Sequence, residues 1–529
     1  MLKALYGENY EKWTQPVRYG NPVELSKGPH LFIDWRYIEP GRILWLSKDG
    51  KPGSLCDLSV EGVYARAFRV PRDIRLSLQK PEKIGPISIR NNPHEFLIIP
   101  NGGLTMIYRE GFYRLWYNTL PEEKFNKLEN TANMITWGDC LCYAESKDGF
   151  EWHKPFLGLC EYRGSRNNNI VFGGPLTAET GFHGGGVFID SSARQEECYK
   201  MVFMGNVLPR KLEKYRNERP NDISPVSFIK NKVRGILGAV SPDGIHWSAL
   251  PEPLVMHFSD TLNTAYYDTN LKRYVGYFRM FYCGRRAIGR SETNDFAKWP
   301  LPDPVLWPGA SEESPSNDYY NNCKVIYPGT ENTHIMFPAI YKRDSDSTEI
   351  RTYSSYDGLY WSRIPGQPLA QGGRLEEWDG GSLFASPGLV PLCGDRIALP
   401  FIGFTVPHKF PRTVPLGNLG YFAWKKERIA AVEAENEGEF YTFPFVCPGR
   451  SLLINAETLR AGFIRVELVD NEGNVIPGRS IEDCDTFTGD CTKITVSWKG
   501  ETGLKSDSRM PIAFHFVMKA AKLYSFEIV

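Results

Sequence analysis

Short runs of apolar and aromatic residues, bounded by turn residues, fill the chain from about residue 95 to residue 424. Such runs, rich in β-branched and aromatic residues, are typical of β-strands. They recur in five groups of roughly 50–90 residues, each with room for about four strands. Amphipathic helices are scarce, and residues 121–133 are the best short candidate. This pattern predicts an all-β fold, a five-bladed β-propeller.

A seven-residue pattern, Ser-x-Asp-Gly-x-x-Trp, ends an apolar run at residues 146–152, 241–247 and 355–361, with a degenerate copy at residues 291–299. The Asp-Gly pair is a strong turn signal, because Gly tolerates positive φ and Asp can cap its own turn. We expect the Trp to pack back onto the strand it follows. Copies of one motif in one chain indicate a repeat architecture.

The pattern changes near residue 446. From there, short strands alternate with turn signals to the end of the chain. This predicts a propeller over residues 1–445 followed by a small β-sandwich over residues 446–529. An early β-type run at residues 31–39 is expected to supply the strand that closes the last blade.

The composition narrows the choice of partner. A chain of 529 residues is too long for one small core and agrees with two domains. Lys plus Arg and Asp plus Glu number 62 each, so there is no basic footprint and we expect no nucleic-acid partner. Aromatic residues, 13% of the chain, suit β-rich cores and also sites that stack on flat ligand faces. The oligomeric state has no signature in the sequence.

The N-terminus and the cysteines bear on location. Residues 1–8 lack the apolar core and cleavage site of a signal peptide, and no run of 18 apolar residues predicts a transmembrane helix. The 11 cysteines are scattered without CxxC spacing, which favours reduced thiols over zinc or disulfides. We therefore expect a cytoplasmic protein with no membrane partner, no metal site and no cofactor. A secreted chain that has lost its signal peptide would look the same.

Two stretches of sequence add to the predicted order of propeller and sandwich. One is Tyr143-Ala-Glu-Ser-Lys-Asp-Gly-Phe-Glu-Trp-His-Lys-Pro155, and the other is Asn455-Ala-Glu-Thr-Leu459 with Val466-Glu-Leu-Val-Asp470. Together with a five-bladed propeller followed by a sandwich, they resemble the furanosidase superfamily of glycoside hydrolases. That group includes the invertase and levanase type (family 32) and the arabinosidase type (family 43). The invertase signatures Trp-Met-Asn-Asp-Pro-Asn-Gly, Arg-Asp-Pro and Glu-Cys-Pro are absent, so the resemblance is to a divergent branch and transfers no catalytic set. It implies an active-site funnel at the propeller axis, a carbohydrate substrate, and room for a structural cation in the central channel.

Glycoside cleavage needs two carboxyl groups, one that protonates the leaving oxygen and one that acts as nucleophile or base. In the implied fold, the funnel is built by residues just before the innermost strand of each blade. Each of these segments holds at least one carboxylate: Glu95, Glu179, Asp260, Asp318, and Glu377 with Asp379. Acidic residues in such loops are also common turn formers. As a set they predict catalytic carboxylates, with Asp260 first because Thr261 and Asn263 follow it and could orient it or bind hydroxyls.

One further catalytic candidate and several binding candidates complete the set. Asp34 interrupts an apolar strand, where a buried carboxylate needs a partner or a purpose. The predicted substrate-binding residues are Asn263, His183, Trp378 and Glu377. His183 precedes three glycines that would let a hydroxyl or a phosphate approach, and Trp378 beside Asp379 suits stacking on a sugar.

Some basic residues could bind an anion or could simply face solvent. Arg285 and Arg286 are adjacent and allow both interpretations, and the basic run over residues 211–219 is expected to be an exposed loop that rims the site. Asp190 and Asp268 follow an innermost strand rather than precede it, and the Asp residues of the repeat turns are structural, so we exclude both groups.

Three functions fit these observations. The first is a glycoside hydrolase acting on a furanoside or a related sugar. The second is a cytosolic glycoside phosphorylase of the mannoside type, which shares the fold and needs a basic cluster beside one acid. His183, Arg285 and Arg286 are the candidates for that cluster. The third is a non-catalytic carbohydrate-binding or protein-interaction propeller, because fold does not fix function.

Overall fold

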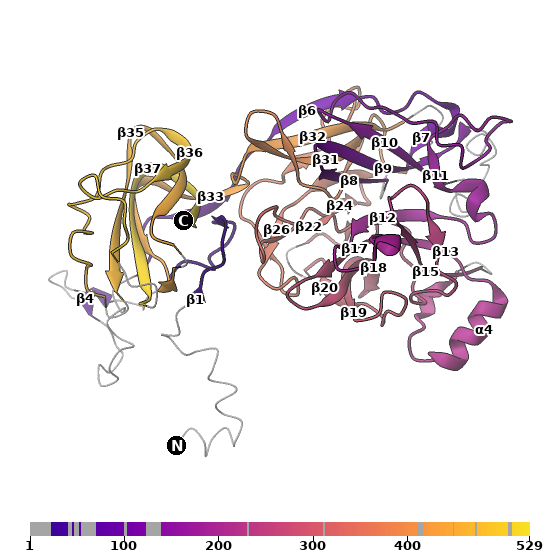
Figure 1. The fold of residues 1–529 in the computed structure, drawn as a ribbon, viewed down its shortest axis with the longest axis horizontal. Helices are drawn as coiled ribbons and strands as arrows, with labels where there is room; N and C mark the ends of the chain where they lie inside the picture. Colours follow the sequence, from indigo (N-terminus) through magenta and orange to yellow (C-terminus); the bar gives the residue numbers. More distant parts are fainter. Residues whose placement is uncertain are drawn as a thin grey trace, which may run out of the picture. The chain divides into compact units, whose positions relative to one another are not determined.

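The computed structural model of the protein describes residues 23–40, 70–99, 103–122, 139–229, 232–309, 313–409, 416–447, 449–470, 473–505 and 510–529, together with 45–46, 52–53 and 311. This part of the chain forms two compact units (Figure 1). Unit one holds the described residues among 1–79 and 427–529, and unit two holds those among 80–426.

Unit two consists of antiparallel sheets that follow one another along the chain. The first sheet contains β7 (Leu97–Ile98), β8 (Leu104–Arg109), β9 (Phe112–Leu120), β10 (Cys140–Ser146) and β11 (Ile170–Gly173). The second contains β12 (His183–Ile189), β13 (Tyr199–Asn206), β14 (Phe228–Ile229), β15 (Lys232–Ser241) and β16 (Ser248–Ala249). The third contains β17 (Thr264–Asp268), β18 (Arg273–Tyr282), β19 (Arg285–Thr293) and β20 (Asp303–Leu306).

Two four-stranded sheets follow, and because each strand of one continues after a short break into a strand of the other, we count them together as the fourth sheet. One contains β21 (Asn317–Tyr319), β24 (Ala339–Lys342), β25 (Ser347–Ile350) and β28 (Ala370–Gln371). The other contains β22 (Lys324–Ile326), β23 (His334–Met336), β26 (Tyr353–Ser355) and β27 (Ser362–Arg363). The fifth sheet contains β6 (Glu82–Ile87), β29 (Ser382–Ala385), β30 (Val390–Leu392), β31 (Arg396–Phe404) and β32 (Asn418–Lys425).

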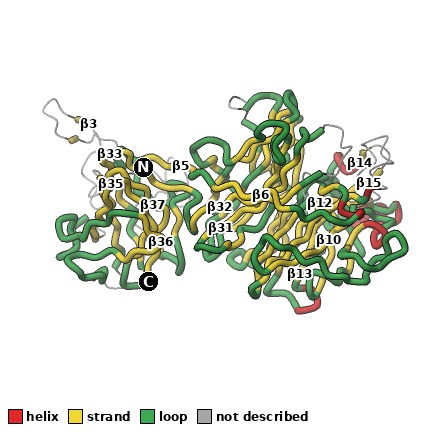
Figure 2. Tube along the Cα trace, turned by 90° about the horizontal axis from the view of Figure 1, so that it is seen from above, coloured by secondary structure: helices red, strands yellow, loops and turns green. Residues whose placement is uncertain are grey.

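Helix is scarce in the described chain, as predicted, and Figure 2 shows only short red segments among the strands. The short 3-10 turns are Pro93–Glu95, Gly174–Thr177, Gln195–Glu197 and Pro225–Ser227. The prediction that the basic run over residues 211–219 is a loop is wrong. Most of this run belongs to α4 (Pro209–Glu218), which buries Leu212 and Tyr215 at helical spacing on one face. Most of the helix predicted at residues 121–133 lies outside the described residues.

Neighbouring sheets of unit two lie beside each other in chain order. β8 adjoins β12, β12 adjoins β17, β19 adjoins β21 and β25 adjoins β29, and β30 of the fifth sheet adjoins β8 of the first. Apolar side chains fill the space between sheets; Trp116, for example, is fully buried between the first and second, and Trp299 packs with residues of the second and third. The last sheet thus lies next to the first.

The three repeat turns have one common structure. In the first, Ser146 Oγ accepts a hydrogen bond from Gly149 N (2.9 Å), and Asp148 Oδ1 accepts from Phe150 N (2.8 Å) and Glu151 N (2.9 Å). The same contacts recur in the other two copies. Each turn needs its glycine at positive φ, which is +83° at Gly149.

The carbonyl of each turn glycine accepts a hydrogen bond from an aromatic side chain of the neighbouring sheet. Trp116 Nε1 of the first sheet donates to Gly244 O (2.6 Å), and Tyr277 OH of the third donates to Gly358 O (2.7 Å). Tyr421 OH of the fifth sheet donates to Gly149 O of the first (2.6 Å). In the second and third of these turns, Trp247 and Trp361 donate to the same carbonyls from within their own turn. The repeat therefore connects sheets as well as ending strands.

The prediction that residues 31–39 close the last sheet is wrong. β6 does so, by pairing with β32 in the registers Tyr421↔Ile84 and Phe422↔Lys83. β2 (His30–Leu31) instead pairs with β37 (Ile512–Ile528) in unit one, where Phe32 joins the core. A two-residue strand followed by an aromatic core residue cannot reveal from sequence which distant sheet it joins.

Unit one is built on long strands rather than the short ones expected. Its sheet contains β1 (Val23–Glu24), β2, β5 (Arg75–Leu78), β33 (Ala430–Tyr441), β34 (Phe445–Val446), β35 (Leu452–Asp470), β36 (Asp490–Thr495) and β37, with a separate pair β3 (Trp45–Leu46) and β4 (Pro52–Gly53). β35 and β37 each merge two predicted strands, and register shifts at Asn455/Ala456 and Thr458/Phe463 interrupt their ladder. Because β33 pairs with β37 and β5, the boundary expected at 445/446 falls inside this unit.

The contact between Gly244 and Trp116 can be tested by adding one methyl group. A Cβ on Gly244 would lie 2.6 Å from Trp116 Cζ2, whereas a Cβ on Gly111, which has a similar positive φ, would meet nothing within 4 Å. We expect Gly111→Ala to cost about 1–2 kcal/mol through backbone strain alone. Gly244→Ala should cost about 1–3 kcal/mol more through overpacking. Urea unfolding of both variants measures the difference; equal midpoints would contradict the packing role.

Candidate active site

Buried and ion-paired groups gather at the end of unit two where the innermost strands begin. Glu95 lies two residues before β7, Asp260 lies just before β17, Asp318 lies in β21 and Asp379 lies just before β29. The starts of β12 and β17 are in contact, since His183 Nε2 lies 3.3 Å from Asp260 O. The environments of these carboxylates decide which of them can meet a substrate.

Glu95 is fully buried and its oxygens are already engaged. Oε2 accepts from the backbone N–H groups of Asn91 and Asn92 (3.0 Å each) and from Lys154 Nζ (2.7 Å), and Tyr117 OH donates to Oε1. Burial raises the pKa of Glu95, but Lys154 and these hydrogen bonds outweigh it and hold the pKa below its usual value. Such a carboxylate fixes the approach to β7.

A metal is not needed to explain this cluster. Potential ligand atoms of His94, Glu95 and Cys142 lie within 4.8 Å of one another. The Lys154 ammonium already occupies the carboxylate, and His94 Nε2 is bonded to Asn169 Oδ1 (2.7 Å). These polar groups satisfy one another.

Asp318 and Asp379 are likewise committed to cations. Arg343 binds both oxygens of Asp318 in a bidentate pair (2.7 Å each), and Arg286 adds its backbone N–H (3.0 Å) and its Nη1 (2.5 Å). Burial raises the pKa of Asp318, but the two arginines lower it by more, so the pKa lies below its usual value. Asp379, buried, receives Lys83 Nζ at 2.9 Å and 3.1 Å.

Asp260 combines an ion pair with access to solvent. Its side chain is 22% exposed, against 0% for Glu95 and Asp318 and 2% for Asp379. It pairs with Arg279 of β18, whose own side chain is 2% exposed. A buried guanidinium favours the ionised form of the carboxylate beside it. Asp260 is therefore placed as a carboxylate that a ligand can reach.

Asp139 is a carboxylate that the sequence prediction missed. It directly precedes β10, and its Oδ2 lies 2.6 Å from His183 Nδ1, while Oδ1 has no hydrogen-bond partner among the described residues. Burial raises the pKa of Asp139 above its usual value, although His183 partly offsets this. The third strand of an antiparallel sheet runs in the direction of the first, so an acid at its start could have been assigned to the same end as Glu95.

Asn263 holds the loop that carries Asp260. It is fully buried, and its Nδ2 donates to Gly184 O (3.3 Å), Ser259 O (3.2 Å) and Thr261 O (3.0 Å). All three bonds go to backbone carbonyls, so the amide nitrogen that was predicted to bind substrate holds the loop before β17 instead.

Trp378 packs inward rather than offering a face to a sugar. Its ring lies 5.3 Å from that of Phe401, and its atoms would meet a Cβ on Gly85, Gly403 or Gly420 within about 3 Å. The neighbouring glycines thus make room for the indole and not for a ligand. Glu179 and Glu377 are exposed, with no place among the buried groups.

Asp34 belongs to unit one and has a local explanation. It binds Arg36 two residues later, through Nε (2.6 Å), Nη2 (2.5 Å) and the backbone N–H (3.1 Å). The turn after β2 therefore supplies the partner that a carboxylate in an apolar stretch requires.

Arginines and a buried tyrosine surround Asp260. Arg279 and Arg286 place their Cζ atoms 5.5 and 5.0 Å from the ring centre of Tyr320, whose hydroxyl lies 2.9 Å from His408 Nε2. Burial raises the pKa of Tyr320, but Lys409 and the two arginines outweigh it and bring the pKa below its usual value. Arg285 does not join them, since it donates to the carbonyls of Asn317 and Ser314.

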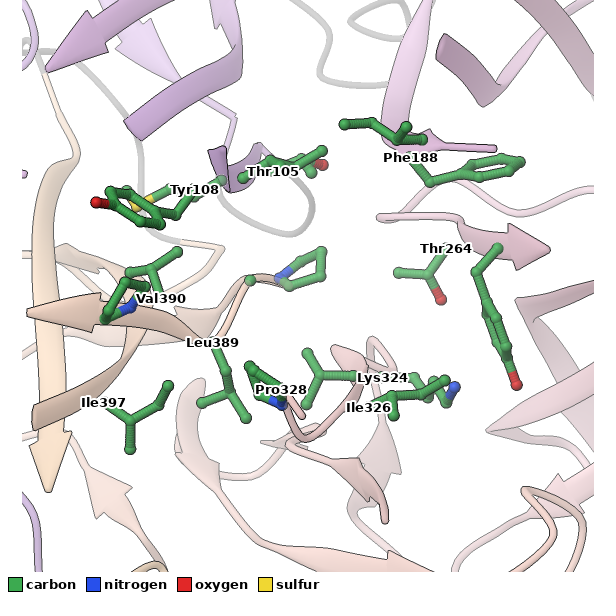
Figure 3. Close-up of a pocket in the computed structure, with 18 of the residues that line it drawn as sticks. Thr105, Tyr108, Phe188, Thr264, Lys324, Ile326, Pro328, Leu389, Val390 and Ile397 are labelled. Atoms are coloured by element: carbon green, nitrogen blue, oxygen red, sulfur yellow. The ribbon is translucent and has the colours of Figure 1, made fainter. Parts of the chain in front are cut away.

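A cavity of about 810 Å³ runs along the innermost strands, from Thr105 and Thr264 near their starts to the turns at their far ends, where Asp395 and Lys426 line it. Figure 3 shows side chains from all five sheets around it, among them Thr105, Phe188, Thr264, Ile326 and Leu389. Its lining is mostly apolar and includes none of the predicted carboxylates. We therefore place the candidate active site outside this cavity, around Asp260.

Comparisons with known proteins give likenesses at the level of fold. No family model matches the chain, and no curated protein sequence matches it. A solved structure described as a glycoside hydrolase shares 12% identity at a TM-score of 0.41, over 66% of this chain and 92% of that one. A thermostable family-43 glycoside hydrolase shares 14% at 0.39, over 66% and 96%. The family 32 β-fructofuranosidase of Bombyx mori shares 10% at 0.37, over 84% and 95%.

Both families named from the sequence are thus among the similar structures, at the low identity of a divergent branch. No helix in the described part of the chain is long and apolar enough to cross a membrane.

The ion network of Asp318 predicts a large stability effect. Asp318→Asn leaves Arg286 and Arg343 facing a neutral amide, and we expect it to lower the free energy of unfolding by about 3–5 kcal/mol. Because the folded pKa is depressed, the wild-type protein should lose this contribution as the pH falls below the usual value of 3.8, and the variant should not. Thermal unfolding from pH 3 to pH 7 tests both effects. Glu179→Gln, at an exposed site, should stay within about 0.5 kcal/mol of wild type.

Proposed function

We propose that unit two is a five-bladed β-propeller and that unit one is a β-sandwich built from its long, bent strands. Five successive antiparallel sheets, with β30 beside β8 and Tyr421 bonded to Gly149, support the closed ring. The register shifts in β35 support a sheet that folds back on itself around the core containing Trp498 and Phe514.

We propose further that the protein is a glycosidase whose reaction takes place at Asp260, on a furanoside or a related sugar. The observation that carries this proposal is the difference among the predicted carboxylates. Glu95, Asp318 and Asp379 are buried and engaged by cationic partners, whereas the side chain of Asp260, which pairs with Arg279, is 22% exposed. An ionised, accessible carboxylate is what a nucleophile or a general base requires.

Asp139 and His183 supply the second group that glycoside cleavage needs. Asp139 retains a proton above its usual pH range because of burial, and it shares a short hydrogen bond with His183, whose Nε2 faces the Asp260 loop. We assign this pair as the proton donor: His183 Nε2 gives its proton to the leaving oxygen while Asp139 passes its proton to Nδ1. The separation of the acid and Asp260 then sets the stereochemical outcome, about 5 Å for retention and about 6.5–9.5 Å for inversion.

The first test removes the charge of Asp260. Asp260→Asn keeps an oxygen for Arg279 but loses the nucleophile or base, so turnover should fall by a factor of about 10³ or more while the circular dichroism spectrum stays unchanged. Nitrophenyl furanosides and the matching pyranosides are suitable substrates. Glu179→Gln is the control and should retain activity. Full activity in Asp260→Asn would refute the assignment, and sugar binding without turnover in either form would favour a binding propeller.

The second test separates an acid from a merely positioning residue. If Asp139 supplies the proton, turnover should fall as the pH rises and the pair loses that proton. Asp139→Asn should abolish this alkaline limb and slow cleavage of natural disaccharides by about 10²–10⁴. A dinitrophenyl leaving group needs little protonation, so the same variant should lose far less activity on it. Equal losses on both substrates would contradict the role.

A further inference from the structure

Three arginines of the second and third sheets lie around shared aromatic rings with little access to water, and one of them, Arg279, pairs with Asp260. Arg234 of β15 is 5% exposed and Arg279 of β18 is 3% exposed, while the side chain of Arg286 of β19 is 21% exposed. Arg234 and Arg279 flank the ring of Phe258, with Cζ atoms 5.6 and 5.8 Å from its centre. Arg279 and Arg286 share the rings of Phe281 and Tyr320. These aromatic faces hold the guanidinium groups but do not neutralise them.

Several guanidinium N–H groups in this cluster have no hydrogen-bond partner. The Nε atoms of Arg234, Arg279 and Arg286 and the Nη1 atom of Arg279 are buried and unpartnered among the described residues. An unpaired buried donor on a charged group costs considerably more than a neutral one. Native proteins satisfy the large majority of such groups, so several unpartnered donors in one cluster call for an explanation such as a ligand, an ion or ordered water.

The cluster also carries more positive than negative charge. Arg343 and Lys409 adjoin the three arginines, and the nearby carboxylates are Asp260, Asp318 and Asp346. Asp318 is already shared between two arginines, and Asp260 pairs with Arg279. Burial lowers the pKa of Arg234, and no acid among the described residues opposes this shift.

We propose that Arg234, Arg279 and Arg286 form a binding site for an oxyanion that enters with the substrate. The planar N–H groups of arginine match the oxygens of a carboxylate or phosphate. Two sources share this chemistry: the carboxylate of an acidic sugar residue, and free inorganic phosphate that replaces water as the attacking group. Which of them is used rests on the proposed function, whereas anion binding itself does not.

In the phosphate case, one phosphate oxygen forms a bond to the anomeric carbon as the glycosidic bond breaks. The leaving oxygen takes a proton from the acid pair of Asp139 and His183. The products are a sugar phosphate and the shortened glycan. In the acidic-sugar case, the anion is a fixed part of the substrate and water is the acceptor.

Arg234 provides the sharpest test because it has no carboxylate partner in the part of the chain that the structure describes. Arg234→Met leaves no acid unpaired and removes a buried charge, so the unliganded protein should melt at the same or a higher temperature. Its affinity for the anion should nevertheless fall roughly 10- to 100-fold. Arg285→Met is the matched control: this arginine donates to the carbonyls of Asn317 and Ser314, so its loss should lower the melting temperature and leave anion affinity unchanged.

The measurement is the melting temperature of the full chain in increasing phosphate, sulfate or glucuronate, against chloride at equal ionic strength. We expect oxyanions to raise it in wild type. Stabilisation by phosphate with phosphate-dependent turnover identifies free phosphate. Stabilisation by glucuronate but not glucose, with cleavage of glucuronides and not glucosides, identifies an acidic sugar. No stabilisation by any oxyanion, or equal affinity in Arg234→Met and wild type, overturns the proposal. Anion binding without any glycosidase activity would retain this site and refute only the proposed reaction.

Discussion

The hydrogen bond from an aromatic side chain to a turn glycine carbonyl is the contact on which unit two depends. The Ser-x-Asp-Gly turn orients that carbonyl outward, because the Ser and Asp side chains occupy the N–H groups around it and glycine adopts positive φ. The neighbouring sheet then supplies Trp116, Tyr277 or Tyr421. One local motif thereby solves two problems, since it ends a strand and fixes the distance to the next sheet, and with Tyr421 it joins the last sheet to the first.

The local parts of this arrangement are visible in the sequence, and the long-range parts are not. Alternating apolar runs and Asp-Gly turns identify most strands of unit two, because strand and turn preferences are properties of a few adjacent residues. Nothing in residues 82–87 shows that they pair with β32, more than 330 residues later. The same limit explains β2, and also β35, where a bulge keeps one long strand continuous through residues that look like a break. Pairing partners are decided by the whole sheet.

For the candidate site, position was predictable and environment was not. The sequence placed Asp260 among the residues that precede innermost strands, together with Glu95 and Asp318. What separates them is their ion partners, Lys154 for Glu95, Arg343 for Asp318 and Arg279 for Asp260, which come from other strands and loops. The adjacent pair Arg285 and Arg286 illustrates the point: neighbours in sequence, they face opposite sides of β19, so one binds backbone carbonyls and the other joins the arginine cluster.

The degenerate copy of the motif at residues 291–299 interrupts the series of turn contacts that connect neighbouring sheets. It has Asn-Asp in place of Asp-Gly, and its Trp299 donates instead to Phe296 O within the same turn. The intact motifs tie the fifth, first and second sheets into one block and the third and fourth into another. Asp139 and His183 belong to the first of these blocks, and Asp260 and Arg279 belong to the second. The seam between the second and third sheets is held instead by Asn263, whose Nδ2 donates to Gly184 O, and by Tyr274, whose hydroxyl donates to Asp190 Oδ2. At this seam, side chains of the sheets themselves therefore replace the contact that the turn glycine makes in the intact copies.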